Sequence, residues 1–483
     1  MIDDPRPLAM ELLVPALALI LLLPALLLIG INLRTKPGNP NLPQGSFGLP
    51  LIGESVQFIR DNWTGHGDKF VRDRIERYGS TVFSTSLFGE PMVFLCGPAG
   101  NKFLFSNEGK KVVQWWPAHV RQLMGRSLFF LTGDEARVRR KLMMAGLFNT
   151  NSLKKCVPKM DEVTRGYFET HWQGKGKVEA CSSIKFFTFQ VACRILMNII
   201  EPELLSRLLY QFNIFLKGLS AIPLNIPGTQ YHCAMRATDM IRKELQLLLR
   251  RRRLELEMKV ASPMEDILTY LLVNADENGK LLPEADIVNE MFGLLFAGHD
   301  TMRSAISLLI KYLGEQPRVH EKVFQGRLQH QRQLLNWEDL QGMKYSWRVV
   351  SEVLRIAPPV VGTFREALDD ITFEGHTIPK GWKLCWSAGY THKDPNCYPN
   401  EKEFDESRFE GTGPQPFSFV PFGGGPRMCL GKEFTRLMIL TFVHSLVNRF
   451  DWDLLDPNEN LSYDPTLIPV NGLPVHPRPR DSN

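Results

Sequence analysis

The chain has 483 residues, of which 44% are hydrophobic and 23% charged, a composition typical of a globular protein with a sizeable core. The net charge of +5 is too small to indicate a nucleic-acid-binding protein. Eight cysteines without a C-x-x-C pair favour a reduced, cytosol-facing domain over a disulfide scaffold.

The N-terminal residues predict a membrane anchor. Residues 12–31 contain no charged side chain, and a run of this length spans a bilayer core of about 30 Å. A cleaved signal peptide is the alternative, but acidic rather than basic residues precede the run. Arg34 and Lys36 follow it, which places residues 1–11 in the lumen and the C-terminal bulk in the cytosol.

The rest of the chain predicts a connector and one large domain. Residues 32–53 are rich in proline and glycine, which predicts a stiff hinge and excludes a helix. No low-complexity linker interrupts residues 54–483, so we expect a single domain there. Hydrophobic periodicity predicts a fold that is mainly α with minor β sheets. The predicted elements are a hairpin of strands 81–88 and 91–96, helices at 160–171, 238–259, 284–314, 346–356 and 432–450, and short strands between 370 and 387.

Ten residues near the C-terminus carry the strongest chemical signal. They read Phe422-Gly-Gly-Gly425-Pro-Arg427-Met-Cys429-Leu-Gly431 and directly precede a predicted helix. Glycine lets a backbone approach a flat group closely, and a helix N-terminus stabilises a thiolate. Arg427 supplies a cation for an anionic group. The combination suggests an axial cysteine ligand for haem iron, whereas a lone cysteine would more often be a buried structural residue.

This run resembles the haem-binding loop F-x-x-G-x-R-x-C-x-G of the cytochrome P450 family, and every specified position is filled. The resemblance covers nearly the whole chain. It implies the cytochrome P450 fold, a haem b held by Cys429 as the metal ligand, and cofactor contacts from Phe422, Gly425, Arg427 and Gly431. In this family the thiolate promotes cleavage of the O–O bond, so the resemblance implies a monooxygenase that uses dioxygen.

The predicted helix 284–314 carries the second signal, the sequence A-G-H-D-T at 297–301. Glycine inside a helix costs roughly 1 kcal/mol relative to alanine, so its presence requires a reason. A locally bent helix with solvated polar residues is one interpretation. The segment also resembles the family motif in which an acid and an alcohol, here Asp300 and Thr301, deliver protons to dioxygen. Met302 stands where many members carry a second hydroxyl, which leaves Thr301 as the relay.

Glu352 and Arg355 form the third signal, because residues at i and i+3 share a helix face. An isolated pair of this kind is usually exposed and contributes little. The family holds such a pair, with the arginine of an F-x-P-x-R-F segment, in a buried triad behind the haem. Arg408 matches that arginine, although Glu406 replaces the proline. The resemblance therefore implies a structural role for Glu352, Arg355 and Arg408.

Three arginines are candidates for the two haem propionates, since arginine pairs well with carboxylates. They are Arg427, Arg365 and Arg140. Arg140 corresponds to the arginine of the family pattern W-x-x-x-R, but Ala136 replaces the tryptophan and neighbouring arginines leave the register open. A solvated basic face is the alternative for Arg140, and the same interpretation applies to the basic run 250–253.

The sequence contains no G-x-G-x-x-G following a strand and no Walker A loop. We therefore expect no directly bound NADPH or flavin. The resemblance implies electrons from an NADPH–cytochrome reductase, and Lys432 and Arg436 suit an acidic reductase surface. The hinge resembles that of microsomal members, which implies a single-pass protein of the endoplasmic reticulum membrane in contact with lipid.

The segments that the family uses to line its pocket are mostly apolar here, which predicts a lipophilic substrate. Several stretches resemble plant terpenoid oxidases such as taxane hydroxylases and beta-amyrin oxidase, and implicate a terpenoid-like substrate. Sterol or brassinosteroid oxidation is an alternative. A haem-thiolate isomerase or dehydratase that does not use dioxygen, and a non-enzymatic haem-binding protein, are two others. The lining segments are 115–130, 292–301, 360–364 and 467–473.

Overall fold

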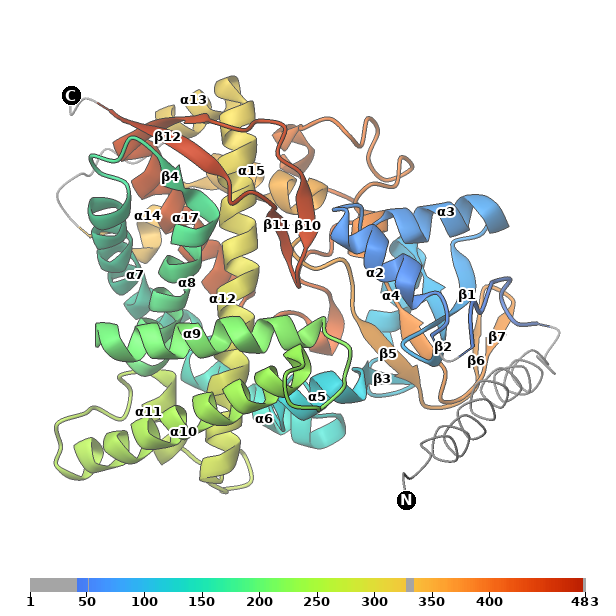
Figure 1. Cartoon of the computed structure of the whole chain (residues 1–483), viewed down its shortest axis with the longest axis horizontal. Coiled ribbons are helices and arrows are strands. Elements are labelled where there is room, and N and C mark those ends of the chain that lie inside the picture. Colours follow the sequence, from blue (N-terminus) through green and yellow to red (C-terminus); the bar gives the residue numbers. More distant parts are fainter. Residues whose placement is uncertain (1–40, 51, 327–333, 481–483) are drawn as a thin grey trace, which may run out of the picture.

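Helices make up most of the molecule in the computed structural model, which describes residues 41–50, 52–326 and 334–480 (Figure 1). The predicted anchor at 12–31 lies outside the described residues, as do the lumenal residues 1–11 and the first part of the hinge. The helices are α2 Ser55–Trp63, α3 Lys69–Tyr78, α4 Gly97–Ser106, α5 Ala118–Met124, α6 Gly133–Gly146, α7 Thr150–His171, α8 Ala180–Met197, α9 Pro202–Leu219, α10 Gln230–Glu257, α11 Ile267–Val273, α12 Glu284–Glu315, α13 Pro317–Gln325, α14 Trp337–Gly342, α15 Lys344–Ile356, α16 Ala388–Thr391 and α17 Lys432–Arg449, with short 3-10 turns at Glu406–Phe409 and Gly425–Arg427.

The strands form four small sheets. The largest has five strands in the order β1-β2-β8-β5-β3 and joins the N-terminal hairpin to strands from the C-terminal half. The predicted hairpin is confirmed, because β1 and β2 are antiparallel and turn at Gly89, whose φ of 79° favours glycine. The strands are β1 Val82–Leu87, β2 Glu90–Leu95, β3 Val112–Trp115, β4 Val178–Glu179, β5 Phe364–Ala367, β6 Ile371–Phe373, β7 His376–Ile378, β8 Lys383–Cys385, β9 Phe450–Leu454, β10 Leu461–Tyr463, β11 Leu467–Pro469 and β12 Pro474–Pro479.

The long helix α12 runs through the middle of the molecule and organises the core (Figure 1). It packs against α8 and α10 on one side and against α15 and α17 on the other. Most of its side chains are buried, and they belong to one large apolar cluster shared with these helices. Because α17 begins directly after the predicted haem-binding run, this packing fixes the position of that run relative to α12.

Three predicted helices have nearly the observed limits, but α7 and α10 begin earlier than predicted. Helix α7 starts at Thr150, where the Asn149 side chain accepts the backbone N–H of Ser152. Pro158 lies inside this helix and interrupts the sequence pattern, since proline removes a backbone donor. The Thr229 side chain caps α10 in the same way. The capping residues therefore set both starts.

One helix among the described residues, α8, has the length and apolarity of a membrane span, and 67% of it is buried inside the protein. Burial to this extent is typical of a core helix.

The basic run 250–253 was predicted to be solvated, and this is wrong for one of its members. Arg252 is 3% exposed and donates to Asp266 and to the carbonyl of Met197. The run lies on a helix, so one of its four side chains points into the core.

Candidate functional site

The cysteine loop, residues 422–431, is held in one conformation by its backbone. The N–H of Cys429 donates to the carbonyl of Phe422 over 2.9 Å. Gly425 has a φ of 64°, and a Cβ there would lie 2.2 Å from the carbonyl oxygen of Phe105 at the end of α4. Only glycine fits this contact. Gly431 is the N-cap residue of α17, and Cys429 lies two residues before this cap.

The Cys429 thiol is both accessible and surrounded by protein. Its side chain is exposed, yet enough protein surrounds it that burial raises the pKa of the thiol. A hydrogen bond from the Gly431 backbone and the charges of Arg140 and Lys432 act in the opposite direction and lower that pKa. A metal cation bound to the sulfur deprotonates such a thiol, so an accessible thiol in this setting fits a metal ligand.

The three candidate arginines, which we call the arginine cluster, lie close together. Burial lowers the pKa of Arg427, and the nearby positive charges of Arg365 and Arg140 lower it further. Its guanidinium also donates to the carbonyl of Leu128 over 3.2 Å. Arg365 projects from β5 with a side chain that is 4% exposed. A cluster of three arginines next to an accessible thiol fits a cofactor that carries two carboxylates.

The structure resolves the register of the arginines in α6. Arg140 reaches the cysteine loop and donates to the carbonyl of Met428 over 2.7 Å. Arg139 points the other way and pairs with Asp286 and Glu290 of α12 at 2.9 and 2.8 Å. Arg140 is therefore the residue of this pair that contacts the cysteine loop, while its contact with a haem propionate stays a prediction.

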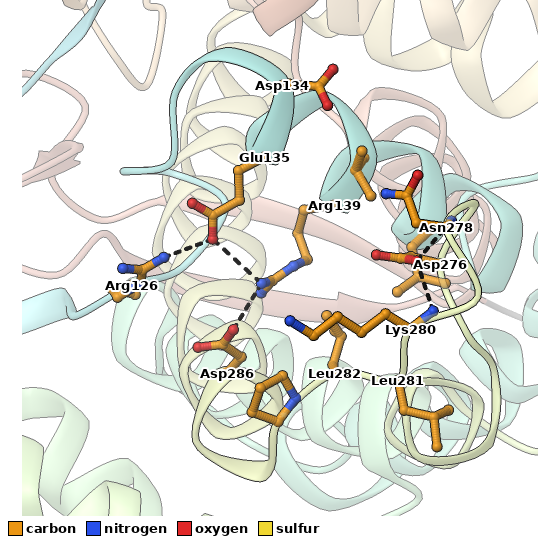
Figure 2. Close-up of a pocket in the computed structure, with 13 residues that line it drawn as sticks. Arg126, Asp134, Glu135, Arg139, Asp276, Asn278, Lys280, Leu281, Leu282 and Asp286 are labelled. Carbon is orange, nitrogen blue, oxygen red and sulfur yellow. Dashed lines mark hydrogen bonds and ion pairs between the residues drawn. The ribbon is translucent and has the colours of Figure 1, made fainter.

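Arg139 borders a separate cavity of about 450 Å³, shown in Figure 2. The cavity lies between the start of α6 and the segment before α12, and charged side chains line much of it. Glu135 pairs there with Arg126 at 2.7 Å, and Asp276 accepts the backbone N–H groups of Asn278 and Lys280. The cysteine loop contributes nothing to the lining. This cavity is thus separate from the cysteine loop, and none of the predicted cofactor residues lines it.

Helix α12 has an open stripe in its middle. Residues 294, 297, 298 and 301 are only half-buried, although most of the helix is buried, and their spacing places them on one face. A Cβ added to Gly298 would meet no atom within 4 Å. The Thr301 hydroxyl lies on this stripe and donates to the carbonyl of Ala297 over 2.7 Å. Open space therefore lies in front of Gly298 on the face that also carries Thr301.

Asp300 turns away from this stripe into the protein. Its carboxylate is 1% exposed, pairs with Arg303 at 2.7 Å and accepts the hydroxyl of Thr466 at 2.7 Å. No hydrogen bond between the Asp300 carboxylate and the Thr301 hydroxyl is among those of the described residues. The predicted acid and alcohol are therefore neighbours in sequence whose side chains have different partners.

Contacts join the four segments predicted to line the substrate pocket. Trp116 and Phe364 have ring centroids 6.4 Å apart, and Phe129 and Phe296 have centroids 6.3 Å apart. The fourth segment reaches α12, because the carbonyl of Leu467 accepts the Ser304 hydroxyl and its N–H donates to Pro359. Segments far apart in sequence thus meet one another and α12, and two of the contacts between them are aromatic.

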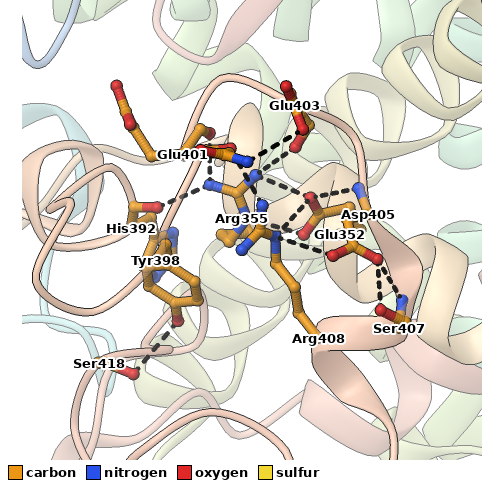
Figure 3. A network of polar contacts seen from close by, with 11 residues as sticks. Glu352, Arg355, His392, Tyr398, Glu401, Glu403, Asp405, Ser407, Arg408 and Ser418 are labelled. Carbon is orange, nitrogen blue, oxygen red and sulfur yellow. Dashed lines mark hydrogen bonds and ion pairs between the residues drawn. The ribbon is translucent and has the colours of Figure 1, made fainter.

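Glu352, Arg355 and Arg408 come together in one polar network, as Figure 3 shows. Arg355 donates to both carboxylate oxygens of Glu352 at 2.7 Å, and both side chains are fully buried. The Arg408 Nε atom lies 3.6 Å from Glu352. Arg355 also donates to the carbonyls of His392, Glu401 and Glu403. One carboxylate thus connects α15 to the chain that leads into the cysteine loop.

We expect Glu352→Gln to destabilise the protein by about 3–5 kcal/mol, because Arg355 would keep its buried charge without a carboxylate partner. The measurement is equilibrium unfolding of the holoprotein in urea. Glu410→Gln is the matched control, since Glu410 pairs with Arg348 at 2.6 Å but its side chain is 67% exposed. That exposed pair is expected to contribute less than about 1 kcal/mol. Equal losses in the two variants would contradict the structural role of Glu352.

Sequence reasoning did not identify several of these residues. Arg303 lies three residues after Asp300 on the same helix, so the i, i+3 spacing could have predicted that pair. Thr466 and Glu290 offered no such signal, because their partners are more than 100 residues away in sequence. Arg436, which was expected to face a reductase, is instead largely buried and pairs with Glu433. Lys432 is exposed, as expected.

Comparison with known proteins agrees with this geometry. Residues 43–479 match the family description "Cytochrome P450". The chain is 45% identical to a beta-amyrin 28-monooxygenase of Vitis vinifera, with 92% of this chain and 94% of that protein covered. It is 43% identical to a beta-amyrin 28-monooxygenase of Panax ginseng, with 96% and 98% covered.

A solved structure also resembles the fold. It is a retinoic acid-bound cyanobacterial protein of the same family, CYP120A1, with a TM-score of 0.83 and 35% sequence identity. The similarity covers 91% of this chain and 99% of the other. The predicted fold class is therefore confirmed for the described residues. The chain belongs to the cytochrome P450 family, as a monooxygenase with a cysteine-ligated haem b.

Proposed function

We propose that this protein is a membrane-anchored monooxygenase that oxidises an unactivated carbon of a triterpenoid of the beta-amyrin type. The observation that carries the proposal is the 43–45% identity, over at least nine tenths of the chain, to proteins named beta-amyrin 28-monooxygenase. The accessible thiol of Cys429 beside the arginine cluster supports the same reaction class. Haem, when bound, supplies the activation of dioxygen.

Cys429 is the proposed metal ligand, and the arginine cluster is the proposed partner of the two propionates. Arg140 and Arg365 approach from α6 and β5, and Arg427 lies within the cysteine loop itself. Phe422 and the glycines at 425 and 431 hold the loop in the conformation that leaves the thiol accessible. The chain's part is thus to orient the cofactor and to neutralise its carboxylates.

Thr301 is the proposed proton donor to bound dioxygen, since its hydroxyl lies on the open stripe of α12. Asp300 is the proposed source that returns a proton to that hydroxyl. The Asp300 carboxylate is held by Arg303 and Thr466 on the buried side of the helix, so the return requires a rotation of its side chain or a connecting water. General acid catalysis depends on such a chain of hydrogen-bonding groups.

The proposed pocket suits a rigid apolar substrate. The converging segments carry Trp116, Phe129, Phe296 and Phe364, whose rings contact one another across the segments. Aromatic and aliphatic linings bind ligands mainly through removal of apolar surface from water. These segments carry few charged groups that could bind an anionic substrate. A hydrocarbon scaffold with few oxygens therefore suits the proposed pocket best.

We propose an NADPH–cytochrome reductase as the electron donor and the endoplasmic reticulum as the membrane. Exposed Lys432, at the start of α17, offers a positive charge beside the cysteine loop. Membrane contact is supported by the connection between α9 and α10, where Ile222, Leu224 and Ile226 are 75%, 51% and 57% exposed. Exposed apolar groups of this size are typical of lipid or protein contacts.

The test is co-expression of the full chain with a plant NADPH–cytochrome reductase in cells that make beta-amyrin. We expect an NADPH-dependent product that carries added oxygen, with carbon 28 identified as the oxidised position by NMR. Parallel cells that make a sterol, a diterpene or another pentacyclic triterpene define the substrate class. Oxidation of the sterol without oxidation of beta-amyrin would replace the triterpenoid assignment with the sterol alternative.

A further inference from the structure

We propose that Glu108 is a positioning residue that holds two members of the arginine cluster and sets the charge balance around the haem propionates. This inference rests on the proposed function, in which Arg365 and Arg427 face those propionates. Glu108 follows α4 and precedes β3, in a short loop that none of the motifs described above includes.

The Glu108 carboxylate bridges the two arginines. One oxygen, Oε2, lies 2.5 Å from Nε of Arg365, and the other, Oε1, lies 3.4 Å from Nε of Arg427. The backbone N–H of Gln114 donates to Oε1 over 3.2 Å and fixes the carboxylate from its own side. The Nε atom is at the inner edge of a guanidinium, so this contact orients each side chain. The Nη atoms have partners of their own, because those of Arg427 donate to the carbonyls of Leu128 and Leu131 and Nη1 of Arg365 donates to the Thr363 hydroxyl and the Phe364 carbonyl.

Burial makes this bridge important. The side chains of Glu108 and Arg365 are 5% and 4% exposed, and that of Arg427 is 11% exposed. Two buried guanidinium groups without a carboxylate would repel each other, and solvent would screen that repulsion only weakly. A single glutamate between them allows both to stay in the core before any cofactor carboxylate arrives.

The net charge of the assembled site depends on Glu108. Arg140, Arg365 and Arg427 carry three positive charges, and Glu108 and two propionates carry three negative charges. With Glu108 the assembled site is neutral, whereas without it the site has one excess positive charge. Reduction of ferric to ferrous haem adds one negative charge, so an excess positive charge favours the ferrous form. Glu108 therefore lowers the reduction potential of the haem.

The experiment is a spectroelectrochemical titration of the purified holoprotein. Glu108→Gln keeps the size of the side chain and removes its charge. We expect the ferric–ferrous equilibrium to move about tenfold toward the ferrous form, which is a rise of about 59 mV for one electron. Glu108→Asp keeps the charge, and its potential is expected to stay within a twofold change in that equilibrium.

Glu366→Gln is the matched control. Glu366 is the next residue along β5, but it pairs with Lys383 at 2.7 Å and its side chain is 35% exposed. Successive residues of a strand face opposite sides of the sheet, so the control removes the same charge from the other face. We expect less than a twofold change in the ferric–ferrous equilibrium. A control shift as large as that of Glu108→Gln would overturn the proposal.

A charge-neutral double variant keeps the proposal testable if Glu108→Gln does not retain haem. Arg365→Gln alone is expected to lower the potential, and adding Glu108→Gln to it is expected to restore the potential toward that of the wild type. Failure of this restoration, or an unchanged potential in Glu108→Gln, would overturn the role of Glu108.

Arg427→Ala separates this inference from the proposed function. If Arg427→Ala lowers the potential while Glu108→Gln leaves it unchanged, the arginines face the propionates and only the role of Glu108 is wrong. If neither variant changes the potential, the placement of the propionates is wrong as well. The first outcome leaves the proposed function standing, and the second rejects its cofactor contacts.

Discussion

Replacing Cys429 with serine is expected to abolish the thiolate-type Soret band of the reduced carbon-monoxide complex and all product formation. The hydroxyl of serine is a far weaker acid than a thiol and does not supply a sulfur ligand to iron. The axial ligand sets the electron density that favours O–O cleavage, so loss of the sulfur removes both the spectrum and the reaction. The measurement is the reduced carbon-monoxide difference spectrum of membranes that contain equal amounts of each protein.

Cys233→Ser is the matched control for this prediction. Among the cysteines of the described residues, Cys233 and Cys429 are the two with exposed side chains, and Cys233 lies on α10, away from the cysteine loop. We expect Cys233→Ser to give the wild-type spectrum and the wild-type activity. A thiolate-type band that persists in Cys429→Ser would show that another residue binds the iron.

Thr301→Ala is expected to separate NADPH consumption from product formation. The Thr301 hydroxyl donates to the Ala297 carbonyl on the open stripe of α12, and removing it takes away the proposed proton donor without removing a metal ligand. Haem content should therefore stay unchanged. Positioned acids and bases contribute roughly 10²–10⁴-fold to rates, so we expect the ratio of product to NADPH consumed to fall at least about tenfold. The electrons are then lost as peroxide or water.

Met302 explains why this effect should be large. It is buried with 0% exposure and has no hydroxyl to replace that of Thr301. Thr301→Ser is the conservative variant, because it keeps the hydroxyl on the same stripe, and we expect it to recover most of the lost coupling. Equal ratios of product to NADPH in wild type and Thr301→Ala would show that the polar pair is only an irregularity of the helix.

The two arginines at 139 and 140 show where sequence reasoning ended. Helix periodicity separates adjacent residues by about 100° on the helix surface, so the two side chains had to face different directions. Which of the two side chains faces the cysteine loop depends on how α6 packs against α12. The structure places Arg139 with Asp286 and Glu290, whereas Arg140 reaches Met428. Burial raises the pKa of Glu290 to about 7 despite the charge of Arg139, which shows how enclosed that contact is.

The arginine cluster shows the same limit. Each arginine was identified from a local pattern, but the carboxylate that joins Arg365 to Arg427 was not. Glu108 lies more than 250 residues before Arg365, in a loop without a recognisable motif. Pairing between residues so far apart is decided by the register of β3 against β5, which brings Gln114 opposite Arg365.

The sequence by itself determined the features that depend on local backbone chemistry. Glycine at 425 suits a backbone φ of 64°, and the spacing of Glu352 and Arg355 places both on one helix face. The tertiary structure alone decided which side chains meet across elements. It turned Asp300 toward Thr466 and away from the face of α12 that bears Thr301. The physical reason is that buried charges take the partners that packing brings within reach, and sequence spacing does not encode that packing.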